Sequence, residues 1–120
     1  MMTLLSLLGA FFDQRDANQR HLNVVVIRMS REGRAQRAIT QDDFDLLVCR
    51  LQQVAAQYPT ATYDGQEVVG GEVRLYFFAD AAEALARALT RALGDVSWCR
   101  GAAVGVCSDI GFRLGEYAVP

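Results

Sequence analysis

The sequence predicts one α+β domain whose strands and helices follow in the order β-α-β-β-α-β, with an additional amphipathic helix in front. Two segments, 21–29 and 72–79, are apolar on both alternating faces, which is typical of strands covered on both sides. Two others, beginning near Thr40 and Asp80, carry apolar residues at helical spacing. The chain has 120 residues, 52% apolar and 22% charged, so one domain with its own core is expected.

Residues 1–20 are predicted to form an amphipathic helix and a polar connector, and residues 21–120 the single domain. Leu4, Leu8 and Phe11 share one face at helical spacing. The apolar run is shorter than the ~20 residues of a membrane span. It also has no basic n-region and no A-x-A cleavage site. We therefore expect this helix to cover part of the sheet rather than to anchor or target the protein.

The first strand is predicted over 21–29 (HLNVVVIRM), near the centre of the sheet. The segment that follows, 30–38 (SREGRAQRA), is polar and contains glycine, which predicts a loop. Arginines stand at every third position across this region, at Arg28, Arg31, Arg34 and Arg37. A solvated loop is the simpler interpretation, and an anion-binding edge is the alternative.

The first long helix is predicted to begin at Thr40 and to end before Pro59. Asp43 stands where a capping box places Glu, and the acids of the first turn suit the positive end of the helix dipole. One face is apolar and should lie on the sheet: Phe44, Leu47, Val48, Leu51, Val54, Ala55 and Tyr58. The opposite face carries Asp42, Asp45, Leu46, Cys49 and Gln53. It is either an ordinary solvated face or an acidic contact surface.

A hairpin is predicted next. Asp64-Gly65 gives a turn signal before a short strand, and Gly70-Gly71 then joins this strand to the following one. In the second strand, Val73, Leu75 and Phe77 alternate with Arg74, Tyr76 and Phe78. Because both of its faces are largely apolar, this strand also belongs near the sheet centre.

The second long helix is predicted behind a capping-box pattern of Asp80 and Glu83, and Gly94 helps to end it. Segment 98–108 (WCRGAAVGVCS) gives a last core strand, and 112–119 (FRLGEYAV) gives either an edge strand or a tail. This order is that of the ferredoxin-like fold, a two-layer sandwich with central first and third strands. One sheet face then lacks helices, so it is wetted, covered by the amino-terminal helix, or used for a partner.

Cys49, Cys99 and Cys107 are odd in number and lack C-x-x-C spacing, and His21 is the single histidine. Neither a zinc site nor a disulfide framework is therefore expected, and the cysteines are interpreted as small buried thiols in a reducing cytoplasm. A phosphate-binding loop is excluded because the chain has no lysine and its glycine pair precedes a strand. We expect no cofactor and no metal.

Two other function classes stay open. Arg74, Tyr76 and Phe78 alternate on one strand face, as base-stacking aromatics do, so a nucleic-acid or anion-binding module that also uses the arginine loop is the alternative function. Against it, the first strand has no aromatic residue and the net charge is −2. An enzyme of the ferredoxin-like monooxygenase or isomerase type would depend on His21 or a tyrosine, and we rank it last.

The run from Tyr63 to Leu93, YDGQEVVGGEVRLYFFADAAEALARALTRAL, covers about a quarter of the chain. It resembles a run found in small bacterial α/β-plait proteins, in which Y-D-G, a glycine cluster, an L-Y-F strand and an acidic helix start recur. Some proteins of this size and shape are similar to immunity proteins encoded beside toxins of contact-dependent growth inhibition. The resembling residues form a turn, a strand and a cap.

The resemblance implies a cytoplasmic, non-enzymatic inhibitor that binds one cognate secreted toxin domain, with no membrane or nucleic-acid partner and with a homodimer left open. Such toxins are often nucleases with basic clefts, which an acidic surface on the inhibitor would attract. The sequence offers two separate groups of acids for this surface. We predict the partner-binding residues to be Asp42, Asp45, Asp64, Glu67 and Glu72.

Overall fold

The computed structural model describes residues 23–30, 39–108 and 113–120, apart from the side chain of Arg113. The predicted amino-terminal helix, the loop arginines from Arg31 to Arg37, and His21 lie outside these residues. The described elements are, in chain order, β1 (Asn23–Ser30), α2 (Gln41–Ala55), β2 (Thr62–Val69), β3 (Glu72–Ala79), α3 (Ala82–Gly94), the short 3-10 helix η1 (Ser97–Cys99), β4 (Ala103–Cys107) and β5 (Arg113–Ala118).

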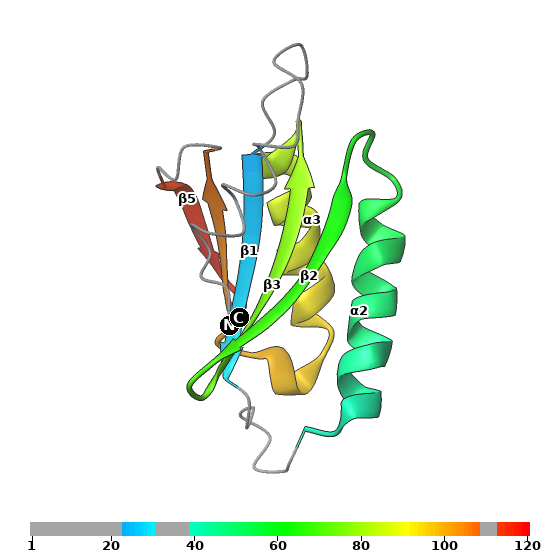
Figure 1. The fold of residues 1–120 in the computed structure, drawn as a ribbon, viewed down its shortest axis with the longest axis vertical. Helices are drawn as coiled ribbons and strands as arrows, with labels where there is room; N and C mark the ends of the chain where they lie inside the picture. The colour runs from blue at the N-terminus through cyan, green and yellow to red at the C-terminus, as the bar shows by residue number, and fades with distance from the viewer. Residues whose placement is uncertain (1–22, 31–38, 109–112) are drawn as a thin grey trace.

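The strands form one antiparallel sheet in the order β2-β3-β1-β4-β5, and α2 and α3 lie together on one side of it (Figure 1). The predicted α+β class is therefore confirmed. Strands β1 and β3 are interior strands, as their two apolar faces predicted. The segment 112–119, left open between edge strand and tail, contributes the edge strand β5 beside β4.

The main core lies between the sheet and the two helices. Alternate residues of β1 and β3, such as Ile27, Leu75 and Phe77, point into it and are fully buried. They meet the apolar faces of the helices, in which Leu51 and Leu89 are also fully buried. The helical periodicity thus places each helix on the sheet as the sequence indicated.

Helix α2 begins with the predicted capping box. The Thr40 hydroxyl accepts a hydrogen bond from the Asp43 backbone N–H at 3.1 Å, and the Asp43 carboxylate accepts one from the Thr40 backbone N–H at 2.8 Å. These bonds satisfy backbone donors that the first turn would otherwise leave unpaired. The helix ends at Ala55, before Pro59.

The predicted Asp64-Gly65 turn is wrong. Strand β2 runs unbroken through these residues, and its register with β3 shifts between Tyr63 and Gly65, which makes a β-bulge. Gly65 has a φ of 120°, a conformation that glycine tolerates and that explains the turn-like signal. The chain reverses only at the predicted Gly70-Gly71 pair, where Gly70 has a φ of 60°.

The predicted Asp80 and Glu83 capping box is also wrong. The N-cap of α3 is Ala81, with no side-chain cap, so the helix begins one residue later than the pattern indicated. The Asp80 backbone N–H donates to the Thr60 hydroxyl at 2.9 Å, which ties the residue to the connection between α2 and β2. Glu83 instead accepts a hydrogen bond from the Tyr117 hydroxyl of β5 at 3.0 Å.

The sheet face opposite α2 and α3, called here the helix-free face because no helix of the described residues lies on it, is also apolar at one end. Val24, Val26, Tyr76 and Phe78 point to this face, and each is between 0% and 6% exposed. None of the four belongs to the core cluster formed with α2 and α3.

Among the described helices, none has the length and apolar character needed to span a membrane.

Candidate functional site

Two groups of side chains that include predicted partner-binding acids lie on opposite sides of the sheet. The first, called the sheet charge network, lies on the helix-free face and consists of Arg28, Glu67, Glu72, Arg74 and Glu116. The second, called the α2 outer face, points away from the sheet and consists of Asp42, Asp45, Leu46, Cys49 and Gln53. Each predicted partner-binding acid except Asp64 belongs to one of these groups.

The sheet charge network is built around two arginines that face each other across strands. Arg28 of β1 is directly opposite Arg74 of β3, an unfavourable arrangement for like charges. Carboxylates offset it on both sides. Arg28 Nη2 lies 3.1 Å from Glu116 Oε2, whereas Arg74 Nε lies 3.3 Å from Glu72 Oε1. Arg74 Nη1 is also 3.9 Å from Glu67 Oε1.

Tyr76 connects this network to the buried part of the sheet. Its hydroxyl donates a hydrogen bond to Glu67 Oε1 at 3.0 Å, and the residue is 1% exposed. Burial, with the Glu67 carboxylate as the second cause, raises the pKa of Tyr76 to about 12. Glu67 is therefore held between Tyr76 and Arg74 and supports the hairpin.

We expect the protein to lose stability in alkaline solution. Burial also raises the pKa of the Cys99 thiol to about 12, and both groups bind their protons more tightly when folded than when unfolded. Stability is therefore complete below the unfolded pKa values, about 8.5 for Cys and 10 for Tyr. It falls by about 1.4 kcal/mol per pH unit for each group as the pH rises from there toward 12. Urea unfolding between pH 7 and 11 measures this loss.

The control for alkaline unfolding is Tyr76→Phe, which keeps the buried ring but cannot ionise. Its free energy of unfolding should fall less steeply than that of the wild type above pH 10, while both proteins share the decline caused by Cys99. Equal slopes above pH 10 would show that Tyr76 does not contribute.

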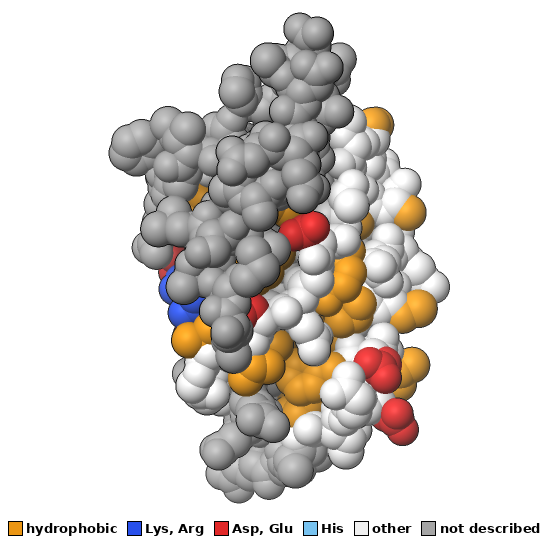
Figure 2. Space-filling view, in the orientation of Figure 1, with side chains coloured by type: hydrophobic (Ala, Val, Ile, Leu, Met, Phe, Trp, Pro, Cys, Tyr) orange, Lys and Arg blue, Asp and Glu red, His pale blue; other side chains and the backbone are white. Residues whose placement is uncertain are grey.

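The α2 outer face has a different character, because its acids make few contacts with other elements. Asp42 and Asp45 are exposed, and Asp45 Oδ1 accepts a hydrogen bond from Gln41 Nε2 at 2.9 Å within the helix. Leu46 is 72% exposed, more than any other large apolar side chain that the structure describes. Figure 2 shows acidic and apolar side chains next to each other over the lower half of α2.

The predicted partner-binding acids of the hairpin take part in the structure of the sheet. Glu67 and Glu72 both pair with Arg74, and Asp64 is the extra residue of the β2 bulge, where it is half-buried. The sequence pattern does not reveal this pairing, because it groups Arg74 with Tyr76 and Phe78 on one strand face and gives no register between β2 and β3. The three residues do share a face, as predicted, but Tyr76 and Phe78 are 1% and 0% exposed.

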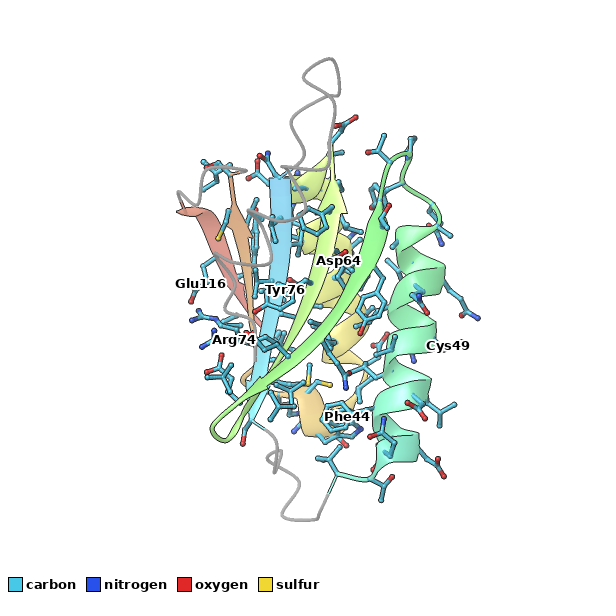
Figure 3. All side chains as sticks on the ribbon, in the orientation of Figure 1. Phe44, Cys49, Asp64, Arg74, Tyr76 and Glu116 are labelled. Atoms are coloured by element: carbon cyan, nitrogen blue, oxygen red, sulfur yellow. The ribbon has the colours of Figure 1, made fainter. Side chains whose placement is uncertain are left out.

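All three cysteines are free thiols in different surroundings. Cys99 is buried, as expected, and Cys107 is half-buried. The expectation of burial is wrong for Cys49, which is exposed and points away from the sheet on α2 (Figure 3). Within the described residues, no group of three or more His, Cys, Asp or Glu side chains is placed to hold a metal ion.

Two depressions lie in the described part of the surface. One, of about 230 Å³, lies beside the start of α3 and includes Asn23, Glu83 and Leu114 in its wall. The other, of about 190 Å³, lies between the start of α2 and strand β2, where Phe44 and Val68 line it. Both are smaller than typical small-molecule sites, which measure about 300–1,000 Å³.

Comparison of the chain with protein-family models, with curated proteins and with solved structures gave no match in any of the three.

Proposed function

We propose that this protein is a cytoplasmic immunity protein that neutralises a cognate secreted toxin domain, such as a nuclease, by forming a stoichiometric complex with it. The resemblance of the run from Tyr63 to Leu93 supports the class of protein. The α2 outer face supports a binding role, and it is the observation that carries the proposal. In this function the protein performs no catalysis and needs no cofactor.

We further propose that the fold is ferredoxin-like, with β5 added at one edge and the amino-terminal helix added in front. The element order from β1 to β4 supports this assignment, as does the strand order β2-β3-β1-β4 within the sheet. The proposed amino-terminal helix would cover the helix-free face, where Val24 and Phe78 are fully buried.

The contact is proposed to use the α2 outer face rather than the hairpin. Glu67 and Glu72 already pair with Arg74, so a partner that recruited them would have to break contacts that stabilise the sheet. Asp42 and Asp45 are exposed, so their charges can attract a basic cleft without that cost. The nucleic-acid alternative is not supported, because Tyr76 and Phe78 are buried and do not present their rings for stacking.

The test first establishes by sequencing whether a large secreted protein is encoded directly upstream of this gene, and it then uses the carboxy-terminal domain of that protein. Asp45→Lys combined with Asp42→Asn should slow association with this domain by roughly tenfold at low salt, because steering by opposite charges raises on-rates. The same double variant should bind with a weaker salt dependence and protect cells less well. Stopped-flow association at several salt concentrations measures the effect.

Glu72→Lys is the control, since it reverses one partly exposed charge, that of the partner of Arg74, on the other side of the sheet. It should leave the on-rate unchanged, and circular dichroism must show that each variant is folded. A slower on-rate for Glu72→Lys alone would move the contact to the hairpin. If neither variant altered the rate or its salt dependence, the acidic-surface proposal would be wrong.

A further inference from the structure

Leu46 stands at the centre of the α2 outer face. Asp42 lies one helical turn before it and Cys49 nearly one turn after it, so all three share the side that points away from the sheet. The neighbouring Phe44 and Leu47 are buried in the core. Leu46 is thus presented on a capped helix whose opposite side is packed in the core.

The charge around Leu46 is negative. Asp42 and Asp45 flank it, and the nearest described cation on the helix is Arg50, one turn later. Arg50 Nη2 is 3.1 Å from Asp95 Oδ2, a residue that follows α3, so this positive charge is offset within the molecule. A cationic protein surface is complementary to such a face, whereas a second copy of the same face would bring like charges together.

We propose that Leu46 is the apolar anchor of the contact with the toxin domain, an inference that rests on the proposed binding function. The partner then presents an apolar pocket for Leu46, with arginine or lysine side chains around its rim. Binding energy in protein interfaces concentrates in a few side chains that lose all contact with water, while rim charges steer the approach. In this contact, Leu46 is the side chain that loses contact with water, and Asp42 and Asp45 are the rim charges that steer the approach.

The inference is tested by Leu46→Ala against the same carboxy-terminal toxin domain, with Leu114→Ala as the matched control. Leu114 is the other highly exposed leucine, at 59%, and lies on β5. Leu46→Ala should weaken the affinity by about 10- to 30-fold, which corresponds to about 1.4–2 kcal/mol, mainly through faster dissociation, because truncation removes the anchoring contact. Leu114→Ala should bind as the wild type does. Both variants should keep the wild-type melting temperature.

Cys49 supplies an independent reporter on the same face. Its reaction with a thiol reagent should slow by at least about tenfold when the wild type is saturated with the toxin domain, because a protein seated on Leu46 would shield the thiol. Comparison with the Cys49→Ser variant shows which part of the reaction comes from Cys49 and which part comes from the other two cysteines. Neither the affinity of Leu46→Ala nor the reaction rate of Cys49 depends on an assay of cell protection.

The outcomes separate the two proposals. If the wild type binds the toxin domain but Leu46→Ala binds equally well and Cys49 stays reactive, the anchor is wrong while the binding function stands. Protection of Cys49 without toxin, rising with protein concentration, would assign the face to a second copy and overturn the inference. No binding by the wild type would overturn the proposed function itself.

Discussion

Replacing Tyr76 and Phe78 together by alanine is expected to unfold the protein. Both side chains are buried in the interior strand β3, at 1% and 0% exposure. Truncating a buried aromatic residue to alanine costs about 3–5 kcal/mol, so the pair would cost about 6–10 kcal/mol. A domain of this size has a total stability of only about 5–15 kcal/mol. Circular dichroism and urea unfolding of the double variant measure the loss.

The single variant Tyr76→Phe separates the two roles of this residue. It keeps the ring in the sheet but removes the hydroxyl that donates to Glu67, so it should cost only about 0.5–3 kcal/mol. A folded double-alanine variant of unchanged stability would contradict the packing role. Salt-dependent binding of oligonucleotides by the wild type, lost in that variant, would favour the nucleic-acid alternative.

Deleting residues 1–14 is expected to give the second large effect. The prediction that Leu4, Leu8 and Phe11 cover the sheet concerns residues outside those that the structure describes. Each Leu or Phe side chain removed from water contributes roughly 1.5–3 kcal/mol, so loss of all three would cost about 5–9 kcal/mol. The truncated protein should melt at a lower temperature and bind a hydrophobic dye or self-associate.

The control for the truncation is a full-length chain with Leu4, Leu8 and Phe11 changed to serine. It keeps the chain length and should reproduce most of the loss if burial of these side chains is the cause. Unchanged melting temperature and no new self-association in either protein would show that residues 1–14 do not cover the sheet.

The element types and the buried faces were predictable because their signals are local. Helical spacing of Phe44, Leu47 and Leu51 requires only neighbouring turns, and the Thr40 cap requires only residues within one turn. The Gly70-Gly71 hairpin likewise depends on two adjacent residues. The exposure of Asp42 and Leu46 on α2 follows from the same periodicity, so this half of the candidate site was visible in the sequence.

Some local signals fit more than one structure. The same pair of residues can form a turn or part of a strand, and either of two adjacent residues can be the N-cap of a helix. Asp64-Gly65 suits a hairpin turn and also a bulge, and only pairing with β3 decides between them. In the same way, Asp80 is a possible N-cap by its sequence, but in the folded protein its backbone N–H bonds Thr60 and Ala81 is the N-cap of α3.

The amino-acid sequence by itself thus determined the α+β class, the order of the elements, the core face of each helix and the exposed acids of α2. Tertiary structure alone decided which charges are paired. Arg28 meets Glu116 from 88 residues away, and Arg74 meets Glu67 through the register of β2 against β3. Register depends on the packing of the whole sheet, and a shift of one residue would move these side chains to the other face. For that reason, the distinction between the acids that hold the sheet together and the acids left for a partner appears only in the folded protein.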